Sequence, residues 1–221
     1  MADIDLIVFD LDGTLVDTRR DLTDAVNYAL QKLGKPPLDV DTVTRNVGDG
    51  VRMLLLRTLQ IEDEDLRMQG RHYFIEYYSQ HLADHTRPYP GISDVLNALA
   101  GRTMAVLTNK SQEFTEPLLR QIGLDGYFAK VVGGNAGFPP KPDPQGLQSI
   151  LQELEAEPET TIMIGDSGND ILVGKSVGAR TCAVTWGYRP KEELLALEPD
   201  FVAEQPLDLV RIIENAAATT Q

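Results

Sequence analysis

The chain has 221 residues, of which 42% are hydrophobic and 24% are charged, as is ordinary for a globular protein. Its 20 basic and 34 acidic side chains give a formal net charge of −14, which disfavours binding to nucleic acid or to an anionic membrane surface. The length predicts one large domain, or one domain that carries an insertion.

The cysteine content fits a reducing compartment, and the N-terminal residues do not resemble a signal peptide. Cys182 is the single cysteine, so no intrachain disulfide can form. The first residues are acidic, unlike the basic start of a signal peptide, and no apolar run approaches the roughly 20 residues that span a bilayer. We therefore expect a cytoplasmic protein without a membrane partner, either a monomer or a homodimer.

Short apolar runs recur along the chain, and a turn and a helical pattern follow most of them. They cover residues 6–9, 103–107, 130–132, 161–164 and 181–184. Because the runs are apolar on both faces, they predict strands of a parallel sheet that is covered on both sides. Alternating strands and helices favour a doubly wound α/β fold, in which ligands bind at the carboxyl ends of the strands.

Residues 18–85 break this alternation, because apolar helical patterns follow one another there without a strand. The patterns cover residues 22–33, 51–59 and 66–82. We interpret this segment as a helical cap inserted after the first strand, with hinges near residues 17–18 and 86–88. The α/β core would then consist of residues 1–17 and 86–221.

Two carboxylates, Asp10 and Asp12, follow the first strand. In a strand, residues two apart point the same way, so these side chains would lie together. A divalent cation would relieve their repulsion, and oxygen ligands favour Mg²⁺ over zinc. Gly13 then allows a sharp turn. The alternative is a solvated acidic turn that caps the next helix.

A second acidic cluster, Gly165-Asp166-Ser167-Gly168-Asn169-Asp170, follows the strand at residues 161–164. A helix N-cap would explain one of its aspartates. It does not explain two acidic clusters at matching places in the topology. Both clusters suit one metal ion held between neighbouring strand ends.

Two further polar segments follow strands or turns. Thr108-Asn109-Lys110 comes after the strand at residues 103–107, where a hydroxyl and backbone N–H groups can hold a phosphoryl group. Lys141 lies between Pro140 and Pro142, which stiffen its backbone and suit a fixed cation that faces developing charge. An ordinary helix N-cap and a solvent-facing lysine are the alternatives.

Together and in this order, four blocks resemble the haloacid dehalogenase superfamily of phosphatases. The blocks are Asp10-Leu11-Asp12-Gly13-Thr14, Thr108-Asn109, Lys141-Pro142 and the segment from Gly165 to Asp170. The resemblance covers nearly the whole chain. It implies a Rossmann-like core with a helical cap, a Mg²⁺ cofactor and a small phosphorylated metabolite as substrate.

The resemblance also implies roles for single residues. Asp10 would attack phosphorus and form an aspartyl phosphate, and Asp12 would act as the general acid and base. Asp166 would ligate Mg²⁺ together with Asp10 and the backbone carbonyl of Asp12, with Asp170 supporting the metal site indirectly. The substrate-binding set in the core would be Gly13, Thr108, Asn109 and Lys141.

The cap carries the loop Asn46-Val47-Gly48-Asp49-Gly50-Val51-Arg52, which resembles the glycine-containing cap loop of bacterial phosphoglycolate phosphatases. Gly48 and Gly50 would permit close approach of a small substrate, and Arg52 could bind its carboxylate. This implies 2-phosphoglycolate as the substrate. An ordinary helix-to-helix turn is the alternative, and the acidic Asp49 counts against an approaching carboxylate.

Other activities use the same core. A phosphomutase of the β-phosphoglucomutase type would use the same Asp10 and Asp12, but the cap loop lacks the Arg-Ser signature expected of that subfamily. A phosphatase for another small phosphate ester or for pyrophosphate also stays open. Asp12 and Asp166 argue against a metal-independent dehalogenase, and the intact set of motif residues argues against a non-catalytic binding protein.

Overall fold

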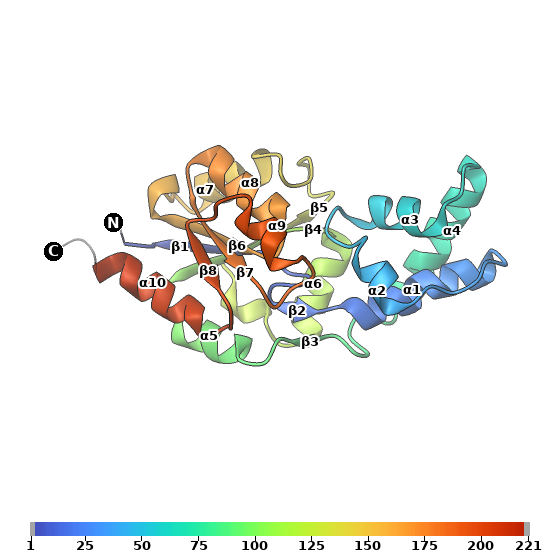
Figure 1. Ribbon diagram of the computed structural model, residues 1–221, viewed down its shortest axis with the longest axis horizontal. Helices are drawn as coiled ribbons and strands as arrows, with labels where there is room; N and C mark the ends of the chain where they lie inside the picture. Colours follow the sequence, from blue (N-terminus) through green and yellow to red (C-terminus); the bar gives the residue numbers. More distant parts are fainter. Residues whose placement is uncertain (1–2, 219–221) are drawn as a thin grey trace.

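A six-stranded parallel sheet forms the centre of the molecule (Figure 1). The computed structural model describes residues 3–218, with side chains up to residue 215. The strand order is β5-β4-β1-β6-β7-β8, so β1 lies in the middle. The bounds of the strands are β1 Leu6–Phe9, β4 Thr103–Ser111, β5 Lys130–Gly134, β6 Thr161–Gly165, β7 Arg180–Val184 and β8 Phe201–Ala203.

The register of β1 brings three strand ends together. Leu6 lies opposite Thr103 of β4 and Thr161 of β6, and the pairing continues in step to Phe9. The carboxyl ends of β1, β4 and β6 therefore meet at one edge. Every side chain of β1 is buried, as the apolar runs predict for a sheet covered on both faces.

Helices cover both faces of this sheet (Figure 1). Leu6 and Val8 pack on the face covered by α7 and α8, whereas Ile7 and Phe9 pack on the opposite face. Leu194 of α9 packs with Ala183 of β7, on the α7 and α8 face. The opposite face carries α5, α6 and α10. The bounds of the helices are α5 Ile92–Ala98, α6 Gln112–Gln121, α7 Gln145–Glu153, α8 Gly168–Val177, α9 Lys191–Leu195 and α10 Asp208–Ala218.

Four of the five helices between β1 and β4, those from α1 to α4, form a separate group at one end of the molecule, for which we keep the name cap (Figure 1). Short antiparallel strands lead into and out of it, and buried Asp21 accepts hydrogen bonds from the backbone N–H groups of His85 and Thr86 and from the Thr86 hydroxyl. These contacts hold together the two chain segments that connect this helical group to the rest of the molecule. The elements are β2 Val16–Asp17, α1 Arg19–Lys32, α2 Val40–Thr44, α3 Val51–Leu59, α4 Glu64–Tyr78 and β3 Arg87–Pro88.

The parallel α/β fold predicted from the sequence is confirmed, and the differences are local. The prediction ended the second strand at residue 107, but β4 continues to Ser111 through a register shift. It did not include β8 or α2, and it extended the last cap helix to residue 82, whereas α4 ends at Tyr78. Within the described residues, no helix is both long and apolar enough to cross a bilayer.

Candidate active site

A tight turn after β1 carries the first pair of aspartates. The Asp10 N–H donates to the Ile164 carbonyl at 2.9 Å, which extends the β1–β6 pairing by one step. The chain then folds back, because the N–H groups of residues 14–16 all lie within 3.2 Å of the Leu11 carbonyl. Gly13 adopts φ +90°, a conformation that favours glycine, and its own N–H donates to the Val16 carbonyl.

Lys141 is a buried cation that holds Asp10. Its Nζ donates to Asp10 Oδ1 at 2.8 Å, to the Leu107 carbonyl at 2.8 Å and to Asp170 Oδ1 at 2.6 Å. Burial alone would lower the pKa of Lys141, but the charges of Asp10 and Asp170 outweigh it and raise that pKa. All three ammonium hydrogens thus have acceptors, and the side chain stays cationic at neutral pH.

Asn109 fixes the loop that carries Lys141. Its Oδ1 accepts from the Lys141 N–H at 2.7 Å, and its Nδ2 donates to the Lys141 carbonyl at 3.1 Å. The same Nδ2 donates to the Gly48 carbonyl in the cap at 2.9 Å. Asn109 therefore positions the lysine and also contacts the cap loop.

Three buried carboxylates, those of Asp10, Asp166 and Asp170, lie close enough to hold one metal ion, with their oxygens within 4.8 Å of one another. Burial raises the pKa of Asp166 well above its usual range, and the charges of Asp10 and Asp170 raise it further. Burial also raises the pKa of Asp170, although Lys141 opposes this effect. A cation at this place would offset the concentrated negative charge.

The donors in this cluster fit Mg²⁺, because they are carboxylate oxygens without nitrogen or sulfur. Asp170 accepts from Lys141 on Oδ1 and from the Ser167 N–H and hydroxyl on Oδ2. These bonds suit a supporting position better than direct ligation. The side chain of Asp12 lies outside the cluster, so a contribution from Asp12 would come from its backbone.

The backbone packs tightly around Asp166. Its Oδ2 accepts from the Tyr188 N–H at 2.6 Å. A Cβ atom at Gly13 would lie 2.4 Å from Asp166 Oδ2, and one at Gly187 would lie 2.2 Å from Asp166 Cβ. Both positions therefore need glycine if Asp166 is to keep its place. At Gly13 this packing requirement is separate from the predicted role in substrate binding.

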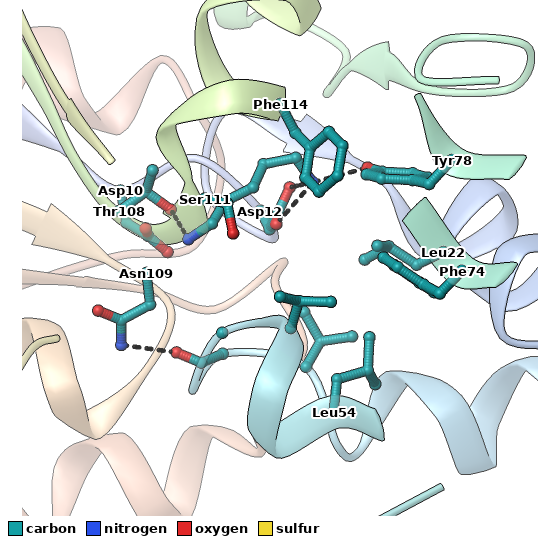
Figure 2. Close-up of a pocket in the computed structure, with 15 residues that line it drawn as sticks. Asp10, Asp12, Leu22, Leu54, Phe74, Tyr78, Thr108, Asn109, Ser111 and Phe114 are labelled. Atoms are coloured by element: carbon teal, nitrogen blue, oxygen red, sulfur yellow. Dashed lines mark hydrogen bonds and ion pairs between the residues drawn. The ribbon is translucent and has the colours of Figure 1, made fainter. Parts of the chain in front are cut away.

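A pocket of about 40 Å³ lies beside Asp10, between the sheet edge and the cap (Figure 2). Lys110, which follows Thr108 and Asn109, extends into it. Its Nζ lies 3.1 Å and 3.2 Å from the two oxygens of Asp12 and 2.6 Å from the Tyr78 hydroxyl of α4. The lining residues are Asp10, Asp12, Leu22, Val47, Gly48, Gly50, Val51, Leu54, Phe74, Tyr78, Thr108, Asn109, Lys110, Ser111 and Phe114.

The structure brings most of the predicted site residues together. Lys141 and Asp166 adjoin Asp10, while Thr108, Gly48 and Gly50 line the pocket. A Cβ atom at Gly50 would lie only 3.1 Å from the Asn109 carbonyl oxygen.

Arg52 is not among these residues. Its side chain is exposed and lines a separate depression with Leu55, Met68 and Asn135. The neighbouring Val51 lines both this depression and the pocket beside Asp10, whereas Arg52 lines only the depression, because successive residues on a helix point about 100° apart. In this arrangement Arg52 does not line the pocket beside Asp10, and its binding of a carboxylate stays a prediction.

Neither Lys110 nor Tyr78 was predicted as a site residue. Lys110 is 7% exposed and Tyr78 is 1% exposed, and each is a polar group inside the packed region. The one sequence feature that could have indicated Lys110 is its place directly after the strand-end motif Thr108-Asn109. Its partner could not be read from the chain, because Tyr78 is 32 residues away on the cap.

Contacts between cap and core were also not predicted. Asn169 Nδ2 donates to Asp49 Oδ1 at 2.8 Å, and Asp49 also pairs with Arg57. The Arg189 guanidinium donates to the backbone carbonyls of Arg45 and Val47. These bonds hold the cap loop against the core in the conformation observed.

A family model described as haloacid dehalogenase-like hydrolase matches residues 7–184. The chain, with its parallel sheet, acidic strand ends and buried lysine, therefore belongs to the haloacid dehalogenase-like hydrolase family. Within that family, it is a phosphatase.

The relatives found by comparison agree with this class. The chain is 38% identical to a phosphoglycolate phosphatase of Vibrio parahaemolyticus, over 97% of this chain and 98% of that one. It is 36% identical to a phosphoglycolate phosphatase of Aquifex aeolicus, over 95% and 97% respectively. A crystal structure of a predicted phosphoglycolate phosphatase from Haemophilus somnus superimposes with a TM-score of 0.91 at 30% identity, covering 96% of this chain and 99% of that chain.

Proposed function

We propose that the protein is a Mg²⁺-dependent phosphatase that hydrolyses 2-phosphoglycolate through an aspartyl phosphate on Asp10. The observation that carries this proposal is the buried arrangement around Asp10. Lys141 holds one oxygen of Asp10 at 2.8 Å, the carboxylates of Asp166 and Asp170 adjoin it, and the pocket opens beside it. A carboxylate fixed in this way can act as a nucleophile.

Hydrolysis would proceed in two displacements. In the first, an oxygen of Asp10 bonds to phosphorus while the bond from phosphorus to the substrate alcohol breaks, and Asp12 gives its proton to the leaving oxygen. In the second, Asp12 takes a proton from water as that water attacks phosphorus. The bond to Asp10 then breaks, which releases phosphate and restores the carboxylate.

The other core residues bind and orient the phosphoryl group. Thr108 lines the pocket next to Asp10, so its hydroxyl can donate to a phosphoryl oxygen. The Lys141 ammonium offsets charge near Asp10, while Asn109 keeps that lysine in place. Mg²⁺, held by Asp10, Asp166 and the backbone of Asp12, would offset the charge on the phosphoryl oxygens.

The residues that select the substrate would come partly from the helical segment 18–85, which we propose acts as the cap over the core. Gly48, Gly50 and Val51 of this segment line the pocket, so a substrate bound beside Asp10 would contact them. The relatives named as phosphoglycolate phosphatases support the same choice.

A screen of phosphorylated metabolites with product analysis tests this proposal. We expect kcat/KM for 2-phosphoglycolate to exceed that for hexose phosphates, with free phosphate and glycolate as products and with activity lost when Mg²⁺ is chelated. A higher kcat/KM for a sugar phosphate would contradict the substrate. Recovery of an isomeric sugar phosphate in place of free phosphate would show a phosphomutase.

A further inference from the structure

The charged side chains that line the pocket all come from the core. In the described part of the chain, the lining contains two carboxylates, Asp10 and Asp12, and one cation, Lys110. The cap contributes apolar side chains, the backbone of two glycines and the Tyr78 hydroxyl. A negatively charged substrate therefore meets one cationic side chain at the wall of this pocket.

Lys110 is held where such a substrate would lie. Its side chain is 4% exposed, and its Nζ lies 4.8 Å from the centre of the Tyr78 ring as well as 2.6 Å from the Tyr78 hydroxyl. A buried ammonium needs an anionic or hydrogen-bonding partner. Asp12 supplies one in the structure, at 3.1 and 3.2 Å.

The contact between Lys110 and Asp12 is long enough for the ammonium of Lys110 to bind another acceptor. Both distances exceed the roughly 2.7–2.9 Å of a short charge-assisted hydrogen bond, and one nitrogen is shared between two oxygens. An ammonium has three hydrogens, and Tyr78 accepts one of them. When Asp12 turns an oxygen to the leaving alcohol of the substrate, Lys110 has a donor available for another acceptor.

We propose that Lys110, steadied by Tyr78, binds the carboxylate of the substrate and so determines specificity for a phosphate ester that carries a carboxylate. This inference rests on the proposed function and deepens it. The phosphoryl group lies at Asp10 and Thr108, and the carboxylate lies at Lys110. The leaving oxygen between the two groups then faces Asp12, the side chain that Lys110 already contacts.

Arg52 is the competing candidate, since the cap-loop sequence predicts it as the carboxylate ligand. Its exposed side chain lines a different depression from the pocket beside Asp10. The two cations therefore lead to opposite expectations, which a pair of variants can separate.

The test compares two substrates of the same length, 2-phosphoglycolate and 2-hydroxyethyl phosphate, in which an alcohol replaces the carboxylate. The wild-type protein should prefer 2-phosphoglycolate. In Lys110→Met, we expect kcat/KM for 2-phosphoglycolate to fall about 30-fold or more relative to 2-hydroxyethyl phosphate, as for the loss of a hydrogen bond to a charged group. Lys110→Arg should restore part of the preference.

Matched variants separate recognition from other effects. Lys35→Met removes a cap lysine whose Nζ donates to the Leu59 carbonyl at 2.6 Å, outside the pocket, and should keep the preference. Equal losses on both substrates in Lys110→Met would overturn the proposal, since Lys110 would then act only through Asp12. Loss of the preference in Arg52→Met, with retention in Lys110→Met, would overturn it in favour of Arg52.

A wrong substrate assignment would give a different result from a wrong role for Lys110. A wild-type protein that shows no preference for 2-phosphoglycolate over 2-hydroxyethyl phosphate contradicts the proposed substrate itself, and the carboxylate role of Lys110 falls with it. A wild-type protein that shows the preference, with a Lys110→Met variant that keeps it, contradicts the role of Lys110 alone. Thermal melting of each variant confirms that the compared proteins are folded.

Discussion

The core and the cap line the same pocket with different kinds of groups. The core supplies every charged side chain of the lining, and behind them lies a buried network in which Lys141 joins Asp10 to Asp170. The cap supplies apolar side chains, glycine backbone and one hydroxyl. The bonds of Lys141 to its carboxylates lie within the core, whereas the cap contacts the core through other hydrogen bonds, such as that between Asp49 and Asn169.

The core and the cap therefore determine different properties of the protein. The reacting groups lie on strand ends that the sheet holds in register, so their geometry follows from the fold. The shape of the pocket depends on how helices α3 and α4 lie against those strand ends. Changes in the core should therefore abolish chemistry, and changes between cap and core should adjust substrate binding.

The largest effect is expected for Asp10→Asn. The amide keeps an oxygen that can accept from Lys141 but is a poor nucleophile, so kcat should fall at least about 10³-fold. Steady-state hydrolysis of 2-phosphoglycolate measures this, and circular dichroism confirms the fold. Turnover near the wild-type rate would show that Asp10 is not the nucleophile.

An intermediate effect is expected for Asp166→Asn, and it concerns stability. Burial raises the pKa of Asp166, so its ionised form destabilises the metal-free folded protein as pH rises from the ordinary value towards neutrality. The neutral amide should raise the melting temperature of the metal-free protein by about 2–4 °C, the shift that ~1 kcal/mol produces at this size. Mg²⁺ should stabilise the wild type and not the variant.

Differential scanning calorimetry with and without Mg²⁺ measures both parts of this expectation. If the Asp166→Asn protein melts at a lower temperature than the wild type without metal, and Mg²⁺ still stabilises it, Asp166 is not a ligand of the metal. Asp166→Glu serves as a second variant, because it keeps the charge but crowds the space that Gly13 and Gly187 leave open.

The smallest effect is expected for Asn169→Ala, which removes the hydrogen bond from the core to Asp49 of the cap. Because Asp49 is 34% exposed and keeps its pair with Arg57, loss of this hydrogen bond should raise KM only about three- to tenfold and change kcat less. Lys130→Met is the matched control, since its exposed pair with Glu153 lies within the core. A lower kcat with unchanged KM would show that this contact serves the chemistry instead.

The fold could be predicted from the sequence because its strands are apolar on both faces and its helices have clear apolar stripes. The prediction of a helix at residues 51–59 agrees with α3. The strand β8 was missed because it has only three residues, and two of these are half-buried at the sheet edge. A run this short carries little periodicity.

The motif residues of the site were predictable, but their partners were not. The spacing within each motif follows the chain, whereas the ion pair of Lys110 with Asp12 spans 98 residues and depends on the order of strands in the sheet. The position of Arg52 depends on the rotation of α3 against the core. The sequence of one helix does not specify that rotation, because it arises from packing against other elements.

Chemical trapping of the intermediate tests whether Asp10 is the nucleophile. The protein is quenched in acid during turnover of 2-phosphoglycolate, treated with borohydride to reduce any aspartyl phosphate to homoserine, and digested for peptide mass spectrometry. We expect homoserine at position 10 in the wild type and none in Asp10→Asn. Homoserine at another aspartate, or unmodified Asp10 in a protein that turns over and carries phosphoryl label elsewhere, would contradict it.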